Sequence, residues 1–244
     1  MSKWLHVVIR CEALWPDHQK EVIFGEHSFI LRPGSNNAEK SIHIKMDHIS
    51  ELDAMKYVNQ FLSVLAWAYD RRVEKIYSST GPSGPQEFSR LKDSIKGQNE
   101  VFPNSIDSYD DPDKVLAMAL YREAISINSI PYRFLGFFKI LNMFWNEKFQ
   151  NKKSPIIEGI RETLLKIKDV EAAKRIKAIT KDEKDVAEYL YQSGRCAIAH
   201  AYQSPVVNPD DPEDIRRLYA DMPVIRALAE YKMENDLGLE RRIF

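Results

Sequence analysis

The feature that most constrains the fold is a change in the spacing of apolar residues on either side of a break rich in proline and glycine. Before residue 78, apolar residues often alternate with polar ones, which is typical of half-buried strands. The segment Ser79–Pro85 holds two prolines and two glycines and cannot continue a helix or a central strand. From Asp113 onward, apolar residues recur every three or four positions, which indicates helices. The sequence therefore predicts an α+β chain: an N-terminal mixed α/β domain, with an antiparallel sheet plus a helix, and then an all-α helical bundle.

The predicted domains are residues 1–80 and 111–244, joined by a polar linker of residues 81–110. In the first domain we expect strands over 4–14, 22–24, 28–31, 41–46 and 73–77, with the second and third joined as a hairpin. Ser50 is the expected N-cap of the helix that follows, because a serine hydroxyl accepts a hydrogen bond from a free N–H of the first turn. One helix packed on a sheet is the expected fold of this domain.

The second domain is expected to be helical throughout. Its predicted helices cover 115–127, 130–145, 155–168, 186–202 and 212–229. Asp211 and Pro212 are typical N-cap and first-turn residues for the last helix. The aromatic residues of 134–145 have the spacing of a core-facing stripe, so we expect them inside the bundle and not on a surface that stacks bases.

Composition excludes several kinds of site. The chain has 244 residues, a formal net charge of −1 and two cysteines, Cys11 and Cys196, which lie far apart. No CxxC pair exists, and the histidines of the first domain have no familiar metal spacing, so we expect neither a metal nor a cofactor. No apolar run approaches the ~20 residues of a membrane span, and the start lacks a signal-peptide core. We expect a soluble cytoplasmic protein with no membrane partner.

An arginine and a histidine interrupt the apolar, alanine-rich segment near residue 197. Arg195 stays charged at physiological pH, and His200 is a side chain that can exchange a proton near neutrality. Together they suit RNA cleavage by the ribose 2′-hydroxyl, with the imidazole moving the proton and the guanidinium stabilising charge on phosphorus. The alternative is purely structural, with Arg195 in a salt bridge and His200 in a hydrogen bond.

The spacing of these two residues bears on how they could meet. On an ideal helix, five residues turn through about 500°, which leaves a net offset of about 140° between Arg195 and His200. A long arginine side chain and a frayed helix end near Pro205 would still allow the two groups to reach one cleft. A symmetric homodimer through this helix achieves this more easily, because two copies that face each other place two arginines and two histidines around one groove, and we expect such a homodimer.

The motif and its surroundings resemble a known family. The pattern Arg-x4-His on a late helix is similar to that of the HEPN superfamily, and Tyr189–Ala201, Leu120–Ala124 and Arg216–Pro223 resemble bacterial MauJ-like proteins of methylamine-utilisation clusters. The likeness covers about residues 110–240. It implies a helical bundle, a homodimer, and metal-independent endoribonuclease activity of the kind used in defence or toxin systems. It also implies Arg195 and His200 as the catalytic pair.

Further residues of the resemblance concern substrate binding. Tyr202 occupies the tyrosine position of an extended Arg-x4-His-x-Tyr motif. Cys196 stands where active members commonly have Asn, Asp or His, which leaves open a non-catalytic module that binds a nucleotide, RNA or a protein. Residues 151–184 carry ten basic and six acidic side chains, a balance of +4. Within them Lys174, Arg175 and Lys177 are candidate phosphate contacts, and a solvated helix face with ion pairs is the alternative.

Overall fold

The structure is a computed structural model that describes residues 3–89, 102–145, 155–182, 185–200 and 205–241. The chain divides into two compact units, Met1–Arg122 together with Arg241–Phe244, and Glu123–Glu240. They are called unit 1 and unit 2 below, and each is described by itself.

Unit 1 is built on a six-stranded sheet. Its strands are β1 (Trp4–Cys11), β2 (Lys20–Phe24), β3 (His27–Arg32), β4 (Lys40–Lys45), β5 (Val73–Gly81) and β6 (Ser105–Ile106). Their order across the sheet is β5-β1-β4-β3-β2-β6, and every neighbouring pair is antiparallel except β2 with β6. The predicted hairpin is confirmed, with Gly25 at φ 57° in the turn between β2 and β3. The sheet therefore combines two pairings between strands adjacent in the chain, β2 with β3 and β3 with β4, with pairings between distant segments, β1 with β4 and β5 and β2 with β6.

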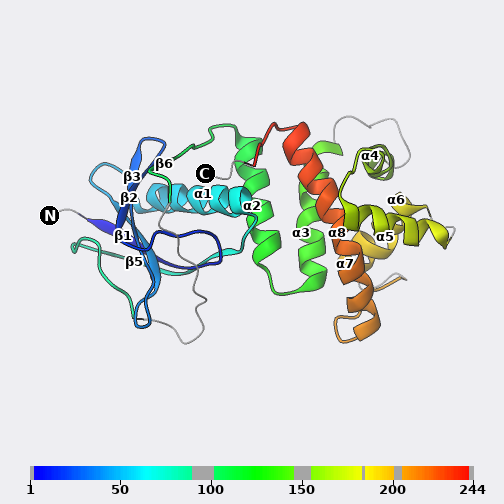
Figure 1. The fold of residues 1–244 in the computed structure, drawn as a ribbon, viewed down its shortest axis with the longest axis horizontal. Helices are drawn as coiled ribbons and strands as arrows, with labels where there is room; N and C mark the ends of the chain where they lie inside the picture. The colour runs from blue at the N-terminus through cyan, green and yellow to red at the C-terminus, as the bar shows by residue number, and fades with distance from the viewer. Residues whose placement is uncertain (1–2, 90–101, 146–154, 183–184, 201–204, 242–244) are drawn as a thin grey trace. The chain divides into compact units, whose positions relative to one another are not determined.

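One face of the sheet packs on helix α1 (Glu51–Tyr69), as Figure 1 shows. The Ser50 side chain accepts from the Asp53 N–H, which confirms the predicted N-cap. Phe61 of α1 lies edge-on to Phe24 and Phe29, with ring centroids 5.5 and 5.1 Å apart. Burial of these rings removes large apolar areas from water and makes this face the core of unit 1.

The other face of the sheet is more polar. Alternation along β1 and β4 turns His6, Ser41 and His43 to this side, where they are nonetheless buried. The ring of Phe88 lies over both histidines, with centroids 5.9 and 6.1 Å away. A loop that follows β5 therefore covers part of this face.

The structure refines two expectations about unit 1. Strand β5 runs four residues farther than predicted and ends immediately before Pro82, which has no N–H to donate. The segment 81–110 was predicted as a linker, yet it supplies β6, whose two residues pair in parallel with β2. Residues 90–101 of that segment lie outside the described residues.

Unit 2 is helical, which confirms the α+β fold class of the chain. Its elements are the end of α2 (Pro112–Ser126), α3 (Ile130–Trp145), α4 (Pro155–Leu164), α5 (Val170–Lys181), α6 (Val186–Tyr189), a π-helix (Leu190–Cys196), α7 (Ala197–Ala199) and α8 (Pro212–Asn235). Helix α8 packs against α3 and α5 (Figure 1). Helix α5 was not predicted as a separate helix.

The core of unit 2 centres on α3. Most of its aromatic stripe is buried, as predicted: Phe134, Phe137, Phe138 and Trp145. Phe144 is the exception, since it is half-buried with the Lys232 ammonium over its ring. Two glycines allow neighbouring helices to approach it, because a Cβ on Gly159 would clash with the Trp145 ring and one on Gly136 would lie 2.8 Å from Ala124. Within the described part of the chain, no helix has both the length and the apolar character needed to cross a bilayer.

Candidate functional site

The Arg-x4-His motif lies on a helical segment that changes its winding, here called the motif segment (Val186–His200). It begins as α6 with Asp185 as N-cap, widens into the π-helix Leu190–Cys196, and ends with the single turn Ala197–Ala199. His200 has extended backbone angles, φ −127° and ψ 120°. The prediction of one regular helix over 186–202 is therefore wrong in its winding and its end, and Tyr202 lies outside the described residues.

This winding brings the two motif side chains together. Arg195 Nη1 lies 3.5 Å from His200 Nε2 within one chain. The expected offset of about 140° assumed an ideal α-helix, whereas a π-turn spans five residues and the helix ends before His200. A second chain is therefore not needed to bring this arginine and this histidine into contact. In a neutral ring, the contact selects the tautomer that carries its proton on Nδ1.

The surroundings of Arg195 differ from those of a structural arginine. Its guanidinium lies 5.8 Å from the Tyr191 ring centre and 3.8 Å from the Cys196 sulfur. Among the described residues no carboxylate is within ion-pair distance of it, so the salt-bridge interpretation finds no partner there. Arg195 and His200 are both half-buried. A half-exposed cation in such surroundings is suited to an anionic ligand.

Two neighbours complete the immediate surroundings of the motif. Burial, followed by the Cys196 thiol, raises the pKa of Tyr191, so its hydroxyl is neutral at physiological pH. Cys196 is a free, half-buried thiol. It therefore borders the pair directly, as its place in the sequence suggested.

A buried carboxylate lies behind the motif segment. Asp221 on α8 is 1% exposed and binds both Arg175, with Nε and Nη2 each 2.8 Å from Oδ1, and the Tyr189 hydroxyl, 2.9 Å from Oδ2. Arg217 reaches within 3.9 Å of the same carboxylate. These four residues are called the Asp221 hub. Sequence reasoning missed it, although a carboxylate one residue before Met222, on the buried stripe of an amphipathic helix, was a usable signal.

The Asp221 hub includes Arg175, one of the three predicted phosphate contacts. The Arg175 guanidinium is engaged by Asp221, so its role is structural. Lys174 and Lys177 are exposed on the same helix. Lys174 and Lys177 are therefore open to a phosphate, whereas the Arg175 guanidinium is already paired with Asp221.

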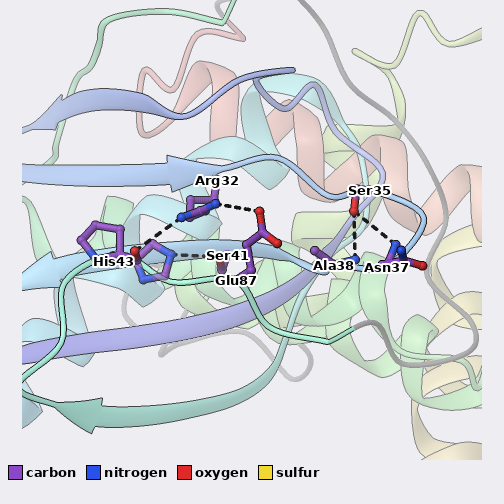
Figure 2. A network of polar contacts seen from close by, with 8 residues as sticks. Arg32, Ser35, Asn37, Ala38, Ser41, His43 and Glu87 are labelled. Atoms are coloured by element: carbon purple, nitrogen blue, oxygen red, sulfur yellow. Dashed lines mark hydrogen bonds and ion pairs between the residues drawn. The ribbon is translucent and has the colours of Figure 1, made fainter.

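A second cluster of titratable groups lies in unit 1 (Figure 2). His43 Nε2 is 2.9 Å from Ser41 Oγ, and its Nδ1 is 2.8 Å from Nδ1 of His6. Arg32 extends beside His43 and donates to Glu87 at 2.9 Å. The order hydroxyl, imidazole, imidazole is that of an activated nucleophile.

Burial argues against catalysis by this cluster. The side chains of Ser41, His43 and His6 are each at most 1% exposed. Burial, followed by the charges of His6 and Arg32, lowers the pKa of His43 to about 3, so its imidazole cannot take up a proton near neutrality. His6 and His43 are therefore core residues of unit 1. No group of three or more metal-binding side chains is found within the ranges that the structure describes.

Unit 1 also contains a cavity of about 720 Å³ between the β2–β3 turn, α1 and the start of α2. The rings of His27 and Tyr57 lie against each other at its wall, with centroids 3.9 Å apart and planes inclined at 44°. Its lining includes none of the residues predicted for the site. The candidate site is therefore placed at Arg195 and His200, where a half-exposed guanidinium contacts an imidazole ring.

Comparison with known proteins supports part of the predicted resemblance. Residues 117–234 match the family described as methylamine utilization protein MauJ. This part of the chain is therefore MauJ-like, and it includes the motif segment and the whole Asp221 hub. The sheet of unit 1 lies outside the match. No curated protein and no solved structure gives a significant match.

Proposed function

We propose that unit 2 is a HEPN-like domain that binds RNA and cleaves it without a metal ion, in a bacterial defence or toxin system. One observation carries the proposal: the Arg195 guanidinium, with no carboxylate partner among the described residues, contacts the His200 imidazole. The similarity to MauJ and the resemblance of the motif support it. A cytoplasmic location belongs to the proposal, since the thiols of Cys11 and Cys196 are free.

In the proposed reaction the nucleophile belongs to the RNA. The ribose 2′-oxygen attacks phosphorus, the bond from phosphorus to the 5′-oxygen breaks, and the products are a 2′,3′-cyclic phosphate and a 5′-hydroxyl. Arg195 turns from His200 to the phosphate when the RNA binds, and the lone pair of His200 Nε2 that it releases accepts the proton of the 2′-hydroxyl. Arg195 donates forked hydrogen bonds to the phosphoryl oxygens as their charge increases.

A homodimer remains part of the proposal for a different reason than the sequence suggested. The leaving 5′-oxygen must take up a proton, and the imidazole of a second copy is a suitable donor. Sedimentation of the purified protein would test this, and a monomer that cleaves RNA at full rate would remove the dimer from the mechanism.

The direct test uses the purified full chain, end-labelled RNA and EDTA. We expect cleavage with a 2′,3′-cyclic phosphate end, and losses of about 10²–10⁴-fold for His200→Ala and Arg195→Ala. Arg226→Ala, which changes an arginine of α8 paired with Glu230, is the matched control and should cleave normally. Cleavage by His200→Ala at the wild-type rate would refute the proposal.

Cys196 favours a second candidate function, a non-catalytic module that binds a nucleotide, RNA or a protein partner. The thiol borders Arg195 at 3.8 Å, and it stands where the resembled nucleases commonly carry Asn, Asp or His. Titration of labelled RNA against the protein distinguishes the two functions. Binding that needs Arg195 without any cleavage supports the module, and absence of RNA binding points to a protein partner.

A further inference from the structure

A stripe of charged side chains on α8 faces the motif segment. Asp214, Arg217 and Asp221 are three and four residues apart and therefore share one face of the helix. Arg217 Nη1 donates a hydrogen bond of 2.7 Å to the carbonyl oxygen of Ser193, in the middle of the π-helix. Arg217 is also 3.5 Å from Asp214. Its guanidinium thus links α8 to the backbone two residues before Arg195.

The Asp221 hub holds the same segment at its start. Tyr189, which donates to Asp221, is the last residue of α6 and directly precedes the π-helix. Burial, together with the charge of Asp221, raises the pKa of Tyr189 and keeps its hydroxyl a donor. A carboxylate as buried as Asp221 is tolerated only with such partners. Movement of the motif segment away from α8 would therefore break these contacts and raise the free energy of the protein.

The π-helix is also held by packing on α3. A Cβ on Gly194 would lie 2.6 Å from the Phe134 ring, so the backbone of Gly194 rests directly on α3. The Ala197 N–H donates to the carbonyl of Gln192, five residues earlier, as a widened turn requires. The backbone just before Arg195 is thus fixed by a hydrogen bond at Ser193 and by an aromatic ring against Gly194.

We propose that Arg217 is a positioning residue for the Arg195–His200 pair: by binding the Ser193 carbonyl from the Asp221 hub, it holds the widened turn that brings the two side chains into contact. A side chain that inserts into a helical ladder is a recognised cause of such irregular turns. Regular α-helical winding would restore the offset of about 140° and separate the pair. The effect on catalysis rests on the proposed function, whereas the effect on the turn does not.

The test of the turn uses Cys196 as a reporter in the full chain. Cys196 is the last residue of the π-helix and half-buried, whereas Cys11 is 1% exposed and should stay silent in the native protein. Arg217→Met removes the guanidinium but keeps an unbranched side chain. We expect the rate of Cys196 modification by a thiol reagent to rise roughly tenfold, because the variant lacks a charge-assisted hydrogen bond that keeps the segment closed.

Matched variants make the result specific. Arg226→Met removes an arginine from the same helix and should leave the rate unchanged, and Arg217→Lys, which keeps a donor, should recover part of the wild-type rate. If Arg217→Met fails to fold, Tyr189→Phe removes one hydroxyl of the hub and should change the rate in the same direction. A wild-type rate in both Arg217→Met and Tyr189→Phe overturns the inference.

RNA cleavage separates this inference from the proposed function. If the wild type cleaves RNA, Arg217→Met should lower kcat by about 10²-fold with KM unchanged, because the pair is misplaced while the RNA-binding surface remains. If the wild type does not cleave RNA but the thiol rates change as expected, the proposed function fails and the positioning role stands. If cleavage is normal in Arg217→Met, the positioning role fails alone.

Discussion

The two units each hold a histidine within hydrogen-bond reach of a polar partner, but the surroundings of the two rings are opposite. His43 in unit 1 is fully buried, neutral and bound on both sides, by Ser41 and His6. His200 in unit 2 is half-buried and faces the guanidinium of Arg195. The comparison shows that proximity of titratable groups does not identify a reactive site, because access and uncompensated charge decide what such groups can do.

The largest expected difference between the two clusters lies in their contributions to stability. His43→Ala should lower the free energy of unfolding by about 2–4 kcal/mol, because it opens a space in the sheet and leaves His6 and Ser41 without their buried partner. Arg195→Met should cost about 0.5 kcal/mol or less, as at a surface position. Urea unfolding of both variants beside the wild type measures the two values.

This pair of variants also tests the assignment of roles. If Arg195→Met were the more destabilising change, Arg195 would have a structural role, and the division between a core cluster and an open site would be wrong. The effects on RNA cleavage should have the reverse order. Arg195→Met should lose most of the activity, whereas His43→Ala should cleave at close to the wild-type rate under conditions where it is folded.

The sequence predicted those parts of the fold that depend on local patterns. The β2–β3 hairpin, the Ser50 cap and the Asp211 cap each follow from residues adjacent in the chain. Strand β6 has only two residues and pairs with a strand about eighty positions earlier, so no alternation within it could reveal it. Local propensity and residue pattern therefore predict individual helices, strands and turns. They do not reveal which distant strands pair with each other.

The candidate site shows the same limit more sharply. Sequence alone selected Arg195 and His200, yet the assumption of 3.6 residues per turn separated them. The π-helix is held by Arg217, which is 24 positions from Ser193, and by Phe134, which lies on another helix. A change of winding imposed by tertiary packing leaves no trace in the spacing of apolar residues.

A smaller loss of stability is expected where the motif segment rests on α3. Gly194→Ala should cost about 1–3 kcal/mol, because the added methyl would meet the Phe134 ring and one of the two must move. Gly81→Ala is the matched control, since nothing lies within 4 Å of a Cβ at that position. Thermal or urea unfolding of both variants gives the comparison. Equal stability of the two would mean that the π-helix is free to shift away from α3.

A change of pH should affect the buried histidine of unit 1. The folded pKa of His43, about 3, lies below its ordinary value of 6.5, so the stability gained from keeping it neutral is present above pH 6.5 and is lost as the pH falls toward 3. At pH 5.5 this group alone should cost about 1.4 kcal/mol relative to pH 8. Urea unfolding across this range measures the cost, and His43→Asn should flatten the dependence. An unchanged pH dependence in that variant would show that another group is responsible.

The smallest expected effect concerns the exposed lysines of α5 and affects affinity, not folding. Lys174 and Lys177 are three residues apart and exposed, while Arg175 between them points to Asp221. If the two lysines bind RNA phosphates, the double change to Gln should reduce the slope of log K against log salt by about 1.4–1.8, because each phosphate that a lysine neutralises adds about 0.7–0.9 to that slope. Fluorescence titration of labelled RNA at several salt concentrations measures the slope. The matched control changes Lys45 and Lys75, two exposed lysines of unit 1, to Gln. If both double variants keep the wild-type slope, the lysines of α5 are a solvated helix face, and RNA binding by unit 2 narrows to the surroundings of Arg195.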